Sequence, residues 1–171
     1  MYFKAMVRCV KSLSILVFMI LMMSCSKKQD DIIISTKFQG ETWGRFDYLT
    51  AFYEVRKAPM TADVILEVVV NDDYPSKYPN HQDDGSFKIN MTIKTPEGGS
   101  RSRDYSFNLK DKDGNWKSEK INGCYTFNLP LISKMTFGEK GDYQFKIENK
   151  YPKDPLCGII SLKIKASDNN D

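Results

Sequence analysis

The residue whose surroundings most clearly specify chemistry is Cys25. It follows a short basic start, an apolar run at 13–23 and the small residue Ser24. This order is typical of a bacterial lipoprotein export signal, in which the cysteine after the cleavage point receives lipid on its thiol. Because the apolar run is shorter than the roughly 20 residues that a spanning helix requires, we expect lipid attachment at Cys25. The alternative is an uncleaved N-terminal anchor in which Cys25 has no role.

Cleavage before Cys25 would divide the chain into four parts. We predict a signal peptide at 1–24, a polar tether at 25–31, a folded domain at 32–166 and a disordered tail at 167–171. The formal charge of +3 comes from the basic residues of the signal alone, so the mature chain is formally neutral. Proteins that bind nucleic acid usually carry a basic excess, so we expect no nucleic-acid partner. The lipid would hold the protein at the cell membrane or outer membrane, facing the periplasm or the cell surface.

Two further thiols could react in the folded domain, those of Cys124 and Cys157. The chain has four cysteines, of which Cys9 leaves with the signal and Cys25 takes the lipid. In an oxidising envelope compartment, Cys124 and Cys157 could form a disulfide. A disulfide requires α-carbons within about 7 Å of each other, a distance that the sequence does not give. Two separately buried thiols are therefore the alternative.

Residues that catalyse hydrolysis are sparse. His81 is the only histidine and no nucleophile motif accompanies it, so neither a zinc hydrolase of the HExxH type nor a Ser-His-Asp site is expected. Carboxylates gather in turns, as a calcium site would require, but their spacing matches no EF-hand loop. These residues are Asp72, Asp73, Asp83, Asp84, Asp111 and Asp113. We interpret them as solvated turn residues, and we expect no catalytic residue, no metal site and no cofactor.

Aromatic residues at turns and at the ends of segments are the candidate binding residues. Aromatic residues make up 12% of the chain, and Trp and Tyr are enriched at protein interfaces. Such rings could instead pack on the core or its edge, or stack against a glycan. The candidates for partner contact are Trp43, Tyr74, Tyr78, Trp116 and Tyr151.

Strands must position these side chains. Short segments rich in β-branched and aromatic residues alternate apolar with polar positions and are separated by Gly, Pro, Asn and Asp. Tyr105, Phe107 and Leu109, for example, share one face of such a segment. About eight segments of this kind predict an all-β fold, a single β-sandwich or jelly-roll-like domain. The expected strands are 32–38, 46–55, 64–70, 87–93, 104–109, 124–131, 143–147 and 158–165.

The same patterns predict local details of the fold. Residues 64–70 are nearly all apolar, which favours a strand covered on both faces. Residues 131–137 could form one helical turn. Turn residues at 96–99 predict a hairpin link, and those at 111–115 predict a second chain reversal. The longest irregular stretch, 71–85, contains prolines that prevent strand pairing, and long loops are frequent sites of function.

Four segments carry a resemblance to a known family. They are 71–75 (NDDYP), 109–116 (LKDKDGNW), Phe137 with 141–147 (GDYQFKI), and 156–159 (LCGI). In their order and spacing they resemble the GldH family, the gliding-motility-associated lipoproteins of Bacteroidota. Ser118 and the pair at 150–151 depart from the family pattern, which tends to place a glycine and a Met-Arg pair there.

The resemblance implies a non-enzymatic envelope lipoprotein associated with the gliding machinery and, in gliding species, with the related secretion apparatus. It implies envelope proteins as partners, and only Cys25 receives a residue role from it, that of lipid attachment to the membrane. The alternative hypothesis is an outer-membrane glycan-binding lipoprotein, which the sandwich pattern and the aromatic residues in loops also suit. An envelope hydrolase is a third hypothesis, for which the chain offers no nucleophile and base in a known arrangement.

Overall fold

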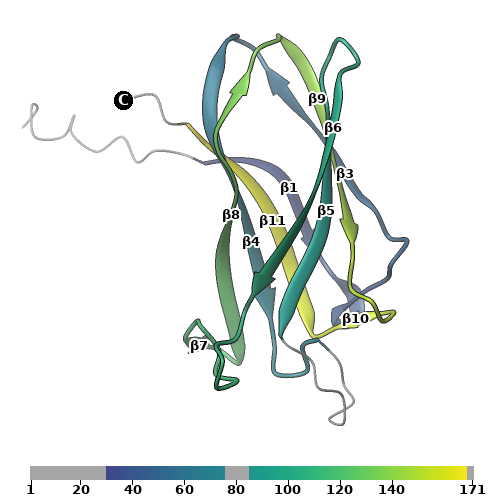
Figure 1. The fold of residues 1–171 in the computed structure, drawn as a ribbon, viewed down its shortest axis with the longest axis vertical. Coiled ribbons are helices and arrows are strands. Elements are labelled where there is room, and N and C mark those ends of the chain that lie inside the picture. Colours follow the sequence, from purple (N-terminus) through teal and green to yellow (C-terminus); the bar gives the residue numbers. More distant parts are fainter. Residues whose placement is uncertain (1–29, 76–84, 169–171) are drawn as a thin grey trace, which may run out of the picture.

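The computed structural model describes residues 30–75 and 85–168, which form two main antiparallel sheets packed as a sandwich (Figure 1). One sheet has the spatial order β1 (Asp31–Lys37), β11 (Ile159–Asp168), β4 (Met60–Val70), β8 (Cys124–Phe137) and β7 (Lys120–Ile121). The other has the order β3 (Leu49–Val55), β9 (Gly141–Asn149), β5 (Ser86–Lys94) and β6 (Ser100–Asn108). The short strands β2 (Thr42–Trp43) and β10 (Leu156–Cys157) pair with each other, and the 3-10 helix η1 (Gln39–Glu41) precedes β2. The predicted all-β sandwich is confirmed.

Alternation of apolar and polar residues determines which face each strand buries. In β4, Val64, Leu66 and Val68 are fully buried, and the residues between them are half-buried. The strands β5 and β9 of the other sheet bury every second residue in the same way. Branched and aromatic side chains suit a pleated surface of which one face is covered. The hydrophobic core therefore lies between the two sheets.

Two predictions about individual strands are wrong. The strand β4 is not covered on both faces, because Ile65, Glu67 and Val69 point outward and are only half-buried by their neighbours. Residues 131–137 are the second half of β8 and form no helical turn, because β4 pairs with β8 as far as Phe137. In addition, β1 begins within the predicted tether, and β11 runs two residues beyond the predicted end of the domain.

A bulge allows β8 to keep its pairing with β4 over this length. Lys134 has a left-handed backbone with φ of 50°, and the register shifts on both sides of Val64. The Asp63 carboxylate accepts hydrogen bonds from the Lys134 backbone N–H at 2.7 Å and from the Ser133 hydroxyl at 3.3 Å. A bulge removes backbone groups from the ladder. Here Asp63 provides the missing acceptor.

Both predicted turns are present. Residues 96–99 link β5 to β6, and the Thr95 N–H donates to the Gly99 carbonyl at 2.7 Å. In the second turn the Asp111 carboxylate accepts a hydrogen bond from the Asn115 N–H at 2.8 Å. Gly98 has φ of 92° and Gly114 has φ of 83°, values that suit glycine.

The chain enters and leaves the sandwich in one region, and the short strands lie in another. In Figure 1 the chain enters β1 and leaves β11 on the same side, in the upper half of the molecule. The strands β7 and β10 and the end of β4, from which residues 71–75 continue, lie in the lower part of the molecule, which we call the lower end. The lower end therefore lies away from the first residues of β1.

Candidate functional site

The exposed aromatic rings of the described chain lie on β3 and on the loop before it. Phe46 is 75% exposed, Phe52 is 65% exposed and Tyr48 is 48% exposed. Phe52 occupies an outward position of β3, between core-facing Ala51 and Tyr53. Since β3 pairs only with β9, it is an edge strand of its sheet. We call Phe46, Tyr48 and Phe52 the aromatic edge.

A lysine from β9 holds the middle ring of the aromatic edge. The Lys146 Nζ lies 3.8 Å from the centroid of the Tyr48 ring and 2.8 Å from Glu148 Oε1. A cation over an exposed ring contributes about 0.5–1 kcal/mol. Lys146 is paired across the ladder with Thr50, so Tyr48 is held against the outer side of this sheet.

Buried polar groups fix the loop that precedes β3. Asn149 is 2% exposed, donates its side-chain N–H to the Trp43 carbonyl at 3.0 Å and accepts from the Tyr151 N–H at 2.8 Å. The indole N–H of Trp43 donates to the Asp47 carbonyl at 2.6 Å. Because Trp43 is fully buried, both ends of the segment that carries Arg45 and Phe46 are attached to the core.

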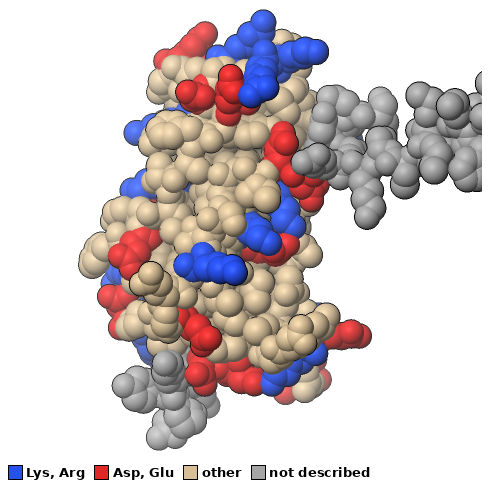
Figure 2. All heavy atoms as spheres, turned by 180° about the vertical axis from the view of Figure 1, so that it is seen from behind, with Lys and Arg blue, Asp and Glu red and all other residues tan. Residues whose placement is uncertain are grey.

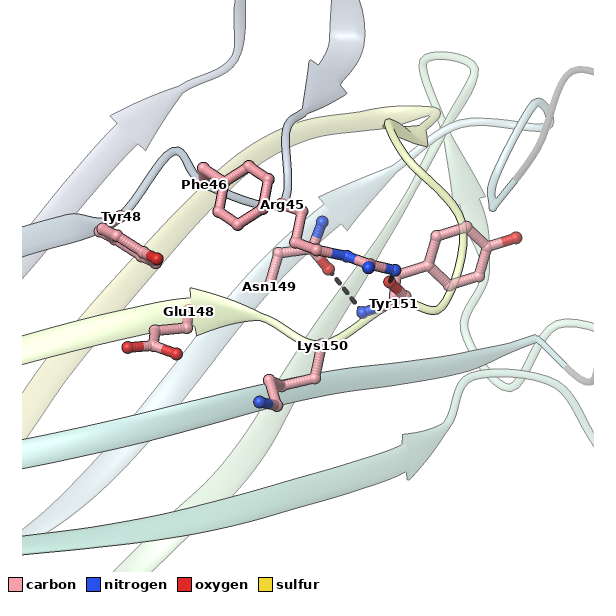
Figure 3. Close-up of a pocket in the computed structure, with 7 residues that line it drawn as sticks. All are labelled: Arg45, Phe46, Tyr48, Glu148, Asn149, Lys150 and Tyr151. Carbon is pink, nitrogen blue, oxygen red and sulfur yellow. Dashed lines mark hydrogen bonds between the residues drawn. The ribbon is translucent and has the colours of Figure 1, made fainter.

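A pocket of about 250 Å³ opens between this loop and the end of β9 (Figure 3). Its lining comprises Arg45, Phe46, Tyr48, Glu148, Asn149, Lys150 and Tyr151. The Arg45 guanidinium donates to the Tyr151 carbonyl at 3.3 Å and to the carbonyl of Pro152, while its backbone N–H donates to the Asp154 carboxylate at 2.9 Å. Aromatic rings and charged groups of both signs therefore meet at one hollow.

A groove of about 610 Å³ continues the aromatic edge toward β1. Phe52, Ile32 and Met60 contribute apolar side chains to it, and Arg56 and Lys57 contribute cations. Ile32 is itself 59% exposed. Phe52 lines the groove while Phe46 and Tyr48 line the pocket, so the exposed rings run from the loop before β3 to the middle of that strand.

The chemistry of this surface suits recognition by contact. Covering exposed rings releases about 25 cal/mol per Å² of apolar surface, and the charged groups of both signs beside the rings, which include Asp31 and Lys57, can orient a polar partner. Figure 2 shows the back of the molecule, where Lys and Arg are interspersed with Asp and Glu on a largely uncharged surface. Within residues 30–75 and 85–168, no group of three or more His, Cys, Asp or Glu side chains could hold a metal ion.

The predicted contact residues are mostly in the core. Trp43 is 0% exposed, Tyr74 is 2% exposed and Tyr151 is 3% exposed, so the prediction that they contact a partner is wrong. Their rings fill the space at the ends of strands, which was the alternative interpretation. Trp116 is half-buried. Tyr78 lies outside the described residues.

Trp116 belongs to a cluster of rings at the lower end. It stacks on Tyr125 with 4.4 Å between centroids, and it lies 6.3 Å from Tyr74 and 6.2 Å from Phe127. The Lys110 Nζ lies 4.3 Å from the centroid of the Trp116 ring. Such ring pairs add about 0.5–1.5 kcal/mol each beyond the area that they bury. Trp116 therefore serves mainly to join β8 to the chain that follows β4.

The turn carboxylate Asp72 is tied to the same cluster. It pairs with Lys120 and accepts a hydrogen bond from the Tyr125 hydroxyl at 3.1 Å. These two donors, Lys120 first, lower the pKa of Asp72, and burial together with Asp72 raises the pKa of Tyr125. Backbone N–H donors, Asn115 first, lower the pKa of Asp111. His81, Asp83 and Asp84 lie outside the described residues.

The two cysteines of the domain are free thiols. Cys124 lies opposite Ile121 in the β7–β8 pair, and Cys157 lies opposite Thr42 in the β2–β10 pair. Both are half-buried, so the structure matches neither a disulfide nor two fully buried thiols. Cys25 lies outside the described residues. The part of the chain that the structure describes contains no helix long and apolar enough to span a membrane.

Sequence reasoning missed the three residues of the aromatic edge. A signal existed, because the predicted strand at 46–55 carries apolar residues at both even and odd positions. Only one set can face the core of a sandwich. The other set, which contains Phe46, Tyr48 and Phe52, therefore had to remain outside, but alternation alone does not say which set that is.

Three of the segments singled out in the sequence meet at the lower end. The Asn71 N–H donates to the Gly158 carbonyl at 2.9 Å, and the Cys157 N–H donates to the Pro75 carbonyl at 3.1 Å. Segment 109–116 joins them through the ring of Trp116. The fourth segment contributes to the β8–β9 hairpin, where Phe137 meets Tyr143 edge-on at 5.0 Å. The class of protein defined here is an antiparallel β-sandwich with a ring-filled end and an exposed aromatic edge.

Within this class the chain belongs to the GldH lipoprotein family, whose model matches residues 34–165. It is therefore a membrane-associated lipoprotein of the GldH type. None of the curated proteins matches the chain.

Several solved structures are similar in fold. A Bacillus thuringiensis Cry1Da tryptic core variant has a TM-score of 0.44 and 11% identity, over 77% of this chain and 18% of its own. The carbohydrate-binding module CBM36 in complex with calcium and xylotriose has a TM-score of 0.39 and 13% identity, over 81% and 93%. A family 35 carbohydrate-binding module from Clostridium thermocellum has a TM-score of 0.36 and 12% identity, over 78% and 87%. Likeness at this level does not indicate what the present chain binds.

Proposed function

We propose that this GldH-type lipoprotein is a non-enzymatic interaction component of the envelope machinery for gliding motility or the associated secretion. A lipid on Cys25 anchors it in the cell membrane or the outer membrane, with the domain in the periplasm or at the cell surface. Its partners are other envelope proteins, which it contacts through the aromatic edge.

The observation that carries the proposal is the exposure of three rings, one on the edge strand β3 and two on the loop that leads into it. Aromatic residues are enriched among the few side chains that dominate binding energy at protein interfaces. The loop that presents Phe46 is attached to the core through Asn149 and Trp43, so little conformational freedom is lost when a partner binds. Membership of the GldH lipoprotein family supports a role in the envelope.

Site-specific cross-linking in living cells tests the contact directly. A photo-reactive amino acid is placed at Phe46 or at Phe52, and at Ser106 as the control, which is exposed on the opposite edge strand β6. We expect the same envelope protein to be captured from both positions of the aromatic edge and not from position 106. Equal capture from all three positions, or no capture from positions 46 and 52, contradicts the proposal.

A variant measures how much the rings contribute. Phe46→Ala combined with Phe52→Ala should lower recovery of the captured partner by about tenfold or more, which corresponds to a loss of about 1.4 kcal/mol. Ile121→Ala is the matched control, because it removes an apolar side chain that is 67% exposed at the lower end. Unchanged recovery with the double variant would exclude the aromatic edge as the contact.

Glycan binding is the second candidate function, and the pocket beside Arg45 favours it. Sugars are recognised by aromatic rings together with polar groups, and this pocket offers Phe46 and Tyr48 beside Glu148 and Lys150. Under this alternative, Tyr48→Ala should abolish binding to a polysaccharide while destabilising the domain by no more than about 0.5–1 kcal/mol, the contribution of its contact with Lys146. A panel of envelope and plant polysaccharides measures it, and absence of binding across the panel leaves the protein-contact proposal.

A further inference from the structure

A third hollow lies where the inner face of β6 meets β8, away from the aromatic edge. Its volume is about 290 Å³, close to the lower limit of about 300 Å³ for small-molecule pockets. Met91, Ile93 and Ile132 provide an apolar lining, and Arg101, Arg103 and Tyr105 provide the polar groups. We call it the seam pocket, because its walls come from both main sheets.

Arg101 and Arg103 occupy strand positions at which core residues are expected. In the β5–β6 ladder, Arg101 lies opposite Ile93 and Arg103 lies opposite Met91, both of which are buried. Residues opposite each other in an antiparallel pair point to the same face. Arg101 and Arg103 therefore project from the inner face of the sheet, whereas arginine is normally found on the outer face of a sandwich strand.

No acidic group offsets these two charges. In the described part of the chain, neither guanidinium forms an ion pair or a hydrogen bond, and the Arg103 guanidinium carbon lies 5.3 Å from the centroid of the Tyr105 ring. Both arginine side chains reach solvent. Two like charges side by side at the mouth of an apolar pocket create a local attraction for an anion.

The hydroxyl of Tyr105 is the second, independent sign of a ligand. Tyr105 is 9% exposed, and its hydroxyl is the one buried side-chain polar atom of the described residues that lacks a hydrogen-bond partner. Leaving a buried polar group unsatisfied costs about 1–3 kcal/mol. A tyrosine hydroxyl is protonated at neutral pH and can act as a donor, and burial raises the pKa of Tyr105 further above that range.

We propose that the seam pocket binds a small amphiphilic anion, in which a carboxylate or phosphate head group carries an acyl or other apolar body. The head group pairs with Arg101 and Arg103, where guanidinium groups bind planar carboxylate and phosphate oxygens well. The apolar body covers Met91, Ile93 and Ile132. An oxygen of the ligand accepts the hydrogen bond of the Tyr105 hydroxyl. A free fatty acid and the monoacyl phosphate part of a lipid share this chemistry.

The test is calorimetric titration of the mature chain 25–171 carrying Cys25→Ser, which removes the acylated thiol. The probes are decanoate and decyl phosphate, each kept below its micelle concentration. Acetate lacks the apolar body and decanol lacks the charge, so they serve as ligand controls. We expect saturable binding of one or both anionic probes and at least about tenfold weaker binding of the controls. Preference for decanoate or decyl phosphate distinguishes a fatty-acid ligand from a lipid phosphate.

Two variants locate the site. The double variant Arg101→Gln with Arg103→Gln should lower the affinity for the anionic probes by at least about tenfold. The double variant Lys57→Gln with Lys94→Gln removes the same amount of charge outside the pocket lining and should leave that affinity unchanged. Tyr105→Phe should weaken binding about three- to tenfold yet leave the melting temperature of the free protein equal or higher, because it removes an unsatisfied hydroxyl. Absence of saturable binding, equal binding of decanol, or unchanged affinity in the double arginine variant would overturn the proposal.

Discussion

Gly158 has no side chain, and the lower end can pack only because no Cβ is present at this position. The residue has φ of 70°, and a Cβ added there would lie 2.7 Å from Asn71 Oδ1 and 2.7 Å from the Asp73 carbonyl carbon, and would also collide with the Tyr74 nitrogen. Contacts this short with backbone cannot be relieved by rotating a side chain. The segments 71–75 and 156–159 can therefore pack together only when glycine occupies this position.

Gly158→Ala is expected to destabilise the domain by about 3 kcal/mol or more, since positive φ adds about 1 kcal/mol to the steric collision. Urea unfolding followed by circular dichroism measures the change. Gly114→Ala is the matched control, because φ there is 83° but no atom lies within 4 Å of the added Cβ. Equal losses in the two variants would show that backbone strain, and not close packing, explains the glycine.

Glu67 is the residue whose ionisation should affect stability most directly. On the outer face of β4 it accepts hydrogen bonds from Lys163 at 2.8 Å and from Lys165 at 2.5 Å, and these lysines, Lys163 first, lower the pKa of Glu67. A lowered carboxyl pKa stabilises the fold above the unfolded value of about 4.3. This contribution is lost as the pH falls through the lower pKa of the folded state.

Glu67→Gln should cost about 1–2 kcal/mol at pH 7, and its difference from the wild type should shrink below about pH 4. Chemical unfolding measured between pH 3 and pH 7 follows both effects. Glu54→Gln, which alters an exposed pair with Arg56, should change stability by less than about 0.5 kcal/mol. A pH-independent difference between Glu67→Gln and the wild type would contradict this account.

At the scale of elements, the length of β8 depends on one carboxylate. Apolar and polar residues in 131–137 fit a helical turn or a strand, and the long pairing with β4 selects the strand. The bulge at Ser133 and Lys134 is compatible with that pairing because Asp63 accepts the two freed donors. The edge strand β3 differs from β8, because its outward-facing ring of Phe52 is not covered by any other element of the described chain.

Asp63→Ala should destabilise the sandwich by about 0.5–1 kcal/mol, because the two exposed donors of the bulge lose the carboxylate that accepts from them. Asp63→Asn keeps a carbonyl oxygen and should recover part of the loss. Thermal unfolding of the three proteins measures this order. If Asp63→Asn were as unstable as Asp63→Ala, the charge of Asp63, and not its hydrogen bonds, would be the stabilising feature.

At the scale of the whole molecule, the N-terminal strand and the family segments lie in different parts of the sandwich. The chain enters β1 in the upper half, whereas three of the segments that carry the family resemblance meet at the lower end (Figure 1). The aromatic edge comprises the loop before β3 and the outer face of that strand. A lipid-anchored domain of this form can therefore present its rings while its N-terminal side faces the membrane.

Cys25→Ser tests the anchor that this arrangement requires. A lipid supplies about 0.8 kcal/mol for each CH₂ group buried in the bilayer, so its removal should move most of the protein from the membrane to the soluble fraction. Fractionation of cells followed by mass spectrometry of the N-terminal peptide measures location and acylation together. Membrane retention of an unacylated Cys25→Ser protein would instead support the uncleaved N-terminal anchor.

The sequence by itself determined the all-β class, the two main turns and the family, because alternation, turn residues and ordered motifs are local properties of the chain. It also specified the lipidation hypothesis at Cys25. Only the tertiary structure decided that Trp43, Tyr74 and Tyr151 are buried while Phe46, Tyr48 and Phe52 are exposed. Alternation divides a strand into two faces, but long-range pairing and the packing of one sheet on the other select the face that is covered. The same packing placed Arg101, Arg103 and Tyr105 at one pocket, which their spacing in the sequence does not reveal.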